Sequence, residues 1–100
     1  MKYNKLVRDK IPEIIIQKGG TPLTHIATDQ EYEEKLKAKL LEEVQEFLQD
    51  ANAEELADIQ EVFLALLQHY NIPAEEVEKV RQKKFDERGG FEQKIILEES

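Results

Sequence analysis

The sequence predicts a mainly α-helical protein in which four helices form a bundle-like arrangement, and residues 23–28 and 91–97 pair as a small two-stranded β ribbon. Apolar residues recur three or four positions apart over most of the chain, which is the spacing of a helix with one buried face. Helix-capping residues, prolines and paired glycines separate these segments. The 100 residues are sufficient for one domain, spanning 1–100, and for no second one.

The first helix is expected to begin between residues 9 and 11 and to end at Gly19 and Gly20. Pro12 suits its first turn, where a missing backbone N–H removes no helical hydrogen bond. The next segment, residues 23–28, has the composition of a short strand. The apolar residues with helical spacing in the first helix are Val7, Ile11, Ile14 and Ile15.

The second helix is expected from Thr28 to about Asp50, because Thr28 and Glu31 form a capping box. Asn52 is a favourable N-cap for a third helix that reaches Tyr70. The link between them is so short that the two helices must pack antiparallel. The apolar stripes expected to face the core are Leu36, Leu40, Val44, Phe47 and Leu48 in the second helix, and Leu56, Ile59, Val62, Phe63, Leu66, Leu67 and Tyr70 in the third.

The fourth helix is expected to have Pro73 at its first position, where a helix tolerates proline. Gly89 and Gly90 are expected to stop it. Its apolar residues are Val77, Val80 and Phe85.

Four acids form two pairs with a spacing of three residues, Glu43 with Glu46 and Glu55 with Asp58. This spacing puts both side chains of a pair on one helix face. At about 100° per residue, each pair lies on the same side of its apolar stripe, so antiparallel packing brings all four to one edge of the hairpin. Several carboxylate oxygens around one point are the ligands that Mg²⁺ prefers. Without a cation, four carboxylates packed together would repel one another.

These acids also have a simpler interpretation. A helical chain with 22 acidic residues produces such spacings by chance. Glu55 lies where it would complete a capping arrangement with Asn52, and acids in a first turn favour the helix dipole. The neighbouring Glu42, Glu54 and Glu61 are expected to be solvated or to support the ligands from outside.

Two cations, Lys84 and Arg88, lie four residues apart near the end of the fourth helix. They would project toward one patch, and the glycines that follow allow close approach of the backbone to a phosphate. Cations at a helix C-terminus also favour the helix dipole when no ligand is present.

Together, the segments Glu42-Glu43-x-x-Glu46, Glu55-x-x-Asp58 and Lys84-x-x-x-Arg88 resemble the motifs of the all-α nucleoside triphosphate pyrophosphohydrolase superfamily, also called MazG-like. Residues 3–12 and 87–91 look like those of its phosphoribosyl-ATP pyrophosphohydrolase-like branch. The resemblance covers nearly the whole chain and implies the all-α NTP pyrophosphatase fold. The metal ligands it implies are Glu43, Glu46, Glu55 and Asp58, and the substrate-binding residues are Lys84, Arg88, Lys5 and Arg8.

The activity implied by the resemblance is Mg²⁺-dependent hydrolysis of a nucleoside triphosphate, or a related nucleotide, to a monophosphate and pyrophosphate. Mn²⁺ is a second candidate metal, Glu46 is the candidate catalytic base, and a homodimer or higher homo-oligomer is expected. One departure is that only eight residues separate Glu46 from Glu55, fewer than in many members of the superfamily. The alternative is a non-catalytic helical module that binds a nucleotide or a protein.

Composition argues against several other functional classes of protein. A net charge of −8, from 22 acids and 14 bases, argues against a general nucleic-acid binder, as does the lack of a basic stripe with interleaved aromatic residues. The absence of cysteine excludes disulfides and thiolate metal sites and fits a cytoplasmic location. With no long apolar run, neither a signal peptide nor a membrane span is expected.

Overall fold

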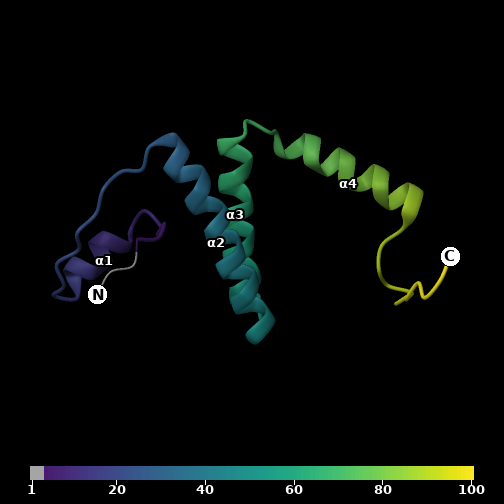
Figure 1. Cartoon of the computed structure of the whole chain (residues 1–100), viewed down its shortest axis with the longest axis horizontal. Coiled ribbons are helices and arrows are strands. Elements are labelled where there is room, and N and C mark those ends of the chain that lie inside the picture. The colour runs from purple at the N-terminus through teal and green to yellow at the C-terminus, as the bar shows by residue number, and fades with distance from the viewer. Residues whose placement is uncertain (1–3) are drawn as a thin grey trace.

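The computed structural model describes residues 4–100 and contains four helices (Figure 1). Helices α2 and α3 lie side by side and antiparallel, and their packing is the only extensive contact between helices in the described part of the chain. The mainly helical class is therefore confirmed. The bounds of the helices are α1 Ile11–Gln17, α2 Asp29–Gln49, α3 Ala53–His69 and α4 Ala74–Arg88.

The helix ends follow the local signals in the sequence. The side chain of Thr28 accepts a hydrogen bond from the Glu31 backbone N–H at 3.2 Å, and Asn52 accepts one from the Glu55 N–H at 3.0 Å. Each bond satisfies a backbone donor that has no partner within its helix. Gly89 ends α4 with a φ of 81°, a conformation that glycine adopts without a steric cost. Pro73 caps α4 from the position before the helix, not from its first turn as predicted.

The predicted β ribbon is wrong. Residues 23–28 and 91–97 form no strand, and Figure 1 places the first segment before α2 and the second beyond α4, far apart. Leu23 and Phe91 are almost fully exposed, so neither segment has a surface to pack against. An isolated pair of strands is marginally stable in water, and the β-leaning composition of these segments was not sufficient to form one.

The core lies between α2 and α3 and is smaller than the apolar stripes predict. Leu36 is the most deeply buried side chain, at 1% exposure, and Val62 and Leu67 are also buried. Leu48 and Leu56, which were expected to face the core, are mainly exposed. Within one chain, therefore, the four helices do not close into a bundle.

The molecule is elongated because α4 leads away from the α2–α3 hairpin (Figure 1). Its radius of gyration is 17.9 Å, whereas a compact domain of 100 residues has one of about 13 Å. None of the helices in residues 4–100 combines the length and the apolar character needed to cross a membrane.

Candidate metal centre

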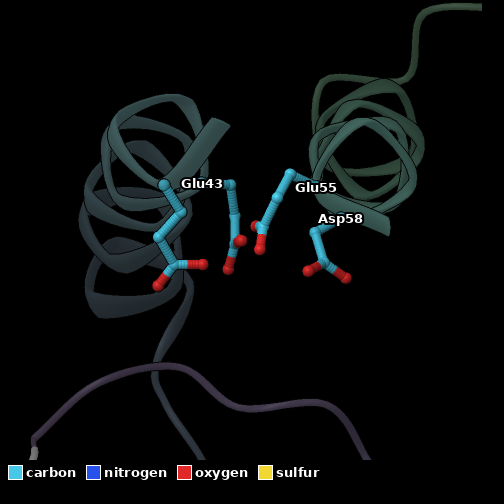
Figure 2. Close-up of side chains that lie close together, drawn as sticks. Glu43, Glu55 and Asp58 are labelled. Carbon is cyan, nitrogen blue, oxygen red and sulfur yellow. The ribbon is translucent and has the colours of Figure 1, made fainter. Parts of the chain in front are cut away.

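The four predicted acids meet at one point on the α2–α3 hairpin. Each offers a carboxylate oxygen, and these oxygens all lie within 4.8 Å of one another. Figure 2 shows Glu43 projecting from one helix and Glu55 and Asp58 from the other, with their carboxylates in the gap between. The three-residue spacing and the antiparallel link bring them together, as the sequence predicted. We call Glu43, Glu46, Glu55 and Asp58 the acid cluster.

Glu43 is the most buried charged residue in the described part of the chain, at 6% exposure. Its Oε2 is shielded from solvent and has no hydrogen-bond partner, and the same is true of Glu55 Oε2. Burial, followed by the nearby charge of Glu46, raises the pKa of the Glu43 carboxyl. Buried polar atoms are nearly always paired, so two unpaired carboxylate oxygens in one cluster mark a place where a cation would fit.

The cations near the cluster come from two parts of the chain, helix α2 and the N-terminal segment. Lys39 lies on α2 itself, with its Nζ 3.4 Å from Glu43 Oε1 and 3.3 Å from Glu42 Oε2. Lys5 and Arg8 come from the N-terminal segment, residues 4–10, which passes the carboxylate ends in Figure 2. Lys39 was not among the predicted site residues, although its spacing of four residues from Glu43 is a readable signal for a contact on one helix face.

The N-terminal segment is held against the hairpin by polar contacts. Arg8 Nη2 donates to Asp58 Oδ1 at 2.7 Å, and Lys5 Nζ donates to Glu42 Oε1 at 3.2 Å. Lys35 Nζ donates to the carbonyl oxygen of Asn4 at 2.7 Å. The structure thus brings two predicted substrate-binding residues, Lys5 and Arg8, to the rim of the acid cluster.

These contacts also set the electrostatics of Glu42. Burial acts to raise the pKa of its carboxyl, but hydrogen bonds from Lys5 and Lys39 outweigh burial and lower the pKa. Glu42 therefore stays ionised beside the cluster and anchors both cations. Glu42 thus lies outside the four acids and contacts two of the cations beside them.

The other two predicted substrate-binding residues are not at this site within one chain. Lys84 and Arg88 are exposed on α4. The acid cluster lies near the turn between α2 and α3, whereas α4 begins beyond the opposite end of α3 and leads away from it (Figure 1). The sequence placed these residues correctly at the end of a helix but could not show the direction in which that helix runs.

An open groove of about 1260 Å³ connects the acid cluster to the rest of the hairpin. The N-terminal segment and α1 line one side of it, and α2, α3 and the turn that leads into α4 line the other. Glu43 and Asp58 lie in it together with the cations Arg8, Lys10 and Lys39. A groove that combines carboxylates with cations suits a ligand that carries both a metal ion and phosphate groups.

Comparisons with known proteins do not assign a family. No family model matches the chain, and no solved structure matches it. An uncharacterized protein of Mycolicibacterium smegmatis is 52% identical to it over 42 residues, which are 42% of this chain and 43% of that protein. The chain thus matches less than half the length of this relative, whose printed name assigns no function.

Proposed function

We propose that this chain is a Mg²⁺-dependent nucleoside triphosphate pyrophosphohydrolase of the MazG-like superfamily, in its phosphoribosyl-ATP pyrophosphohydrolase-like branch, which releases pyrophosphate and a nucleoside monophosphate. The observation that carries the proposal is the unpaired, buried Oε2 of Glu43 inside a cluster of four carboxylates. Such an arrangement is unfavourable for a purely structural surface, because it combines burial with like-charge repulsion. A divalent cation offsets both costs.

In this proposal Glu43, Glu46, Glu55 and Asp58 hold Mg²⁺, with Mn²⁺ as a substitute of similar ligand preference. When bound, the metal offsets phosphate charge and lowers the pKa of a coordinated water. Glu46 is the most exposed of the four acids and is therefore the carboxylate best placed to accept a proton from an entering water.

The cations at the rim bind the phosphate chain. Arg8 offers a planar guanidinium whose two terminal nitrogens can contact two phosphate oxygens at once. In the structure these nitrogens face Asp58 at 2.7 Å and Glu61 at 3.9 Å, which sets them directly beside the proposed metal ligands. Lys5 supplies a second positive charge to the same groove rim.

We further propose that the active form is a homodimer or a higher homo-oligomer. Large apolar side chains remain exposed on α3 and α4, among them Leu56, Phe63, Val80 and Phe85. A second copy would cover them, and its α4 would bring Lys84 and Arg88 to the acid cluster of the first copy. In this proposal both residues bind phosphate from the partner copy, because within a single chain they lie away from the acid cluster.

The test is Mg²⁺-dependent release of pyrophosphate across a panel of nucleoside triphosphates. Wild type is expected to hydrolyse at least one of them, and the double variant Glu43→Gln with Asp58→Asn is expected to lose about a hundredfold or more of that activity. The matched control removes two exposed acids outside the cluster, Glu34→Gln with Glu75→Gln, and should retain it.

Equal activity in wild type and the cluster variant would contradict the enzymatic proposal. Calorimetry with Mg²⁺ and a non-hydrolysable nucleotide then identifies the alternative. Tight binding of the analogue without turnover of the natural nucleotide would define a non-catalytic nucleotide-binding module, and the absence of both would leave the protein-binding alternative.

A further inference from the structure

A lysine of α2 contacts the acid cluster. Lys39 is one helical turn before Glu43, and its Nζ lies within 3.4 Å of Glu43 Oε1 and 3.3 Å of Glu42 Oε2. Its side chain is only 18% exposed, whereas that of Lys37, two residues earlier on α2, is 63% exposed. Ordering and partly desolvating a lysine side chain is costly, so this position requires negative partners.

The contact divides the two oxygens of Glu43 between two environments. Oε1 faces the ammonium group of Lys39, and Oε2 is buried without a partner. In Figure 2 the Glu43 carboxylate lies in the gap beside Glu55 and Asp58. An ion pair on Oε1 favours the orientations of the carboxylate that keep this oxygen beside the ammonium group, and in the structure Oε2 then lies buried.

We propose that Lys39 is the resident counterion of the acid cluster and a positioning residue for Glu43. It offsets negative charge while no divalent cation is bound, and it holds the Glu43 carboxylate with Oε2 directed toward the other acids. This inference rests on the proposed function, because it assumes that the cluster binds a metal ion. It adds a residue to the site that neither the predicted motifs nor the resemblance assigned.

Lys39 differs in this role from Arg8, which also contacts the cluster. Arg8 is 54% exposed and belongs to a segment outside the helices, so it can exchange Asp58 for a phosphate. Lys39 is fixed on α2 and more buried, so it stays when ligand binds. Lys39 therefore remains beside the cluster whether or not ligand is bound, whereas Arg8 can leave Asp58 and contact the substrate.

The test compares thermal unfolding of the full chain without divalent cations and with saturating MgCl₂. Lys39→Met should lower the metal-free midpoint by roughly 5 °C or more, because it leaves a buried carboxylate uncompensated. With magnesium the loss should be smaller, since the metal then offsets the same charge. The magnesium-induced rise of the midpoint is thus expected to be larger in Lys39→Met than in wild type.

Two further variants separate charge from packing. Lys39→Arg should restore the wild-type values, and the control Lys37→Met should leave the magnesium-induced rise unchanged, because Lys37 pairs with Glu33 away from the cluster. In case Lys39→Met does not fold without metal, the double variant Lys39→Met with Glu43→Gln provides the readout. It should be more stable than Lys39→Met in metal-free buffer, because the uncompensated charge has been removed.

Equal destabilisation with and without magnesium would assign Lys39 to packing and overturn the proposal. Additive effects in the double variant would do the same. A wild type whose midpoint does not respond to magnesium would instead remove the proposed metal site. In that case the metal-free comparison of Lys39→Met with the double variant still decides whether Lys39 acts as a counterion.

Discussion

Arg8 and Lys39 show how single residues set the charge around the acid cluster. Both are cations in contact with it, but Arg8 is exposed and joined to Asp58 by a 2.7 Å hydrogen bond, whereas Lys39 is held within α2. A surface ion pair contributes little to the free energy of unfolding. We therefore expect the contact between Arg8 and Asp58 to matter for ligand binding and not for folding.

Replacing Arg8 should therefore impair hydrolysis of the nucleotide without weakening metal binding. We expect Arg8→Met to lower kcat/KM for the preferred nucleotide by roughly a hundredfold, because one charge-assisted contact to phosphate is lost. The affinity for Mn²⁺ should not fall, since Arg8 provides no metal ligand. Steady-state kinetics and a Mn²⁺ titration measure the two quantities.

Arg81→Met is the control for Arg8→Met, because Arg81 pairs with Glu78 on its own helix. An unchanged kcat/KM would exclude Arg8 from the phosphate site.

Glu33 provides a pH-dependent contact away from the cluster. Hydrogen bonds from His69, Tyr70 and Lys37, in that order, lower the pKa of its carboxyl below the usual 4.5. A group whose pKa is lower in the folded state stabilises the protein above its unfolded pKa and loses that contribution as the pH falls through its folded pKa. The free energy of unfolding of wild type should therefore exceed that of Glu33→Gln at pH 5 and above.

The difference between wild type and Glu33→Gln should disappear as the pH falls below 4.5. Urea unfolding at a series of pH values measures it. The opposite trend, a difference that grows in acid, would show that these hydrogen bonds do not favour the ionised form.

At the scale of elements, the sequence predicted features that depend on near neighbours. The caps at Thr28 and Asn52 each need a partner three residues away, and the acid cluster needs only two helical spacings and a short link. The β ribbon and the direction of α4 depend on long-range contacts that no local pattern encodes. Lys39 was not predicted because it belongs neither to the two acidic pairs nor to the basic motif, although its spacing of four residues from Glu43 indicates a contact on one helix face.

The cap at Asn52 connects helix formation to the site, because its partner is the backbone N–H of Glu55. We expect Asn52→Ala to reduce the free energy of unfolding by about 1 kcal/mol. It should also weaken Mg²⁺ binding, because the first turn of α3 carries Glu55. Asn52→Ser retains a capping oxygen and serves as the control. Denaturant unfolding and a magnesium titration of the three proteins provide the measurements. A stable Asn52→Ala variant with wild-type metal affinity would contradict this link.

At the scale of the whole molecule, residues 4–100 bury few of their large apolar side chains. The radius of gyration is 17.9 Å, because α4 leads away from the hairpin. Val80 and Phe85 on α4 are half exposed. Small domains have little stability to spare, and in the described part of this chain α4 has no extensive contact with another helix. The exposed apolar side chains of α4 are the observation on which the proposed self-association rests.

We expect the wild-type protein to be at least a dimer at micromolar concentrations, as measured by sedimentation equilibrium. Val80→Asp with Phe85→Asp should produce a smaller species, because charges then replace two of the apolar side chains that α4 exposes. Leu23→Asp is the matched control, since Leu23 is fully exposed outside the helices and should leave the mass unchanged. A monomeric wild type, or equal masses for all three proteins, would refute the proposed oligomer.

Whether the acid cluster binds a divalent cation, as we propose, is decided by Mn²⁺ binding measured by electron paramagnetic resonance. Wild type should bind Mn²⁺, and Mg²⁺ should displace it. Glu43→Gln should weaken binding by about tenfold or more, because the most buried ligand loses its charge. The control Glu34→Gln should bind as wild type does. If wild type takes up no Mn²⁺ at millimolar concentration, or if Glu43→Gln binds it equally well, the cluster is not a metal site.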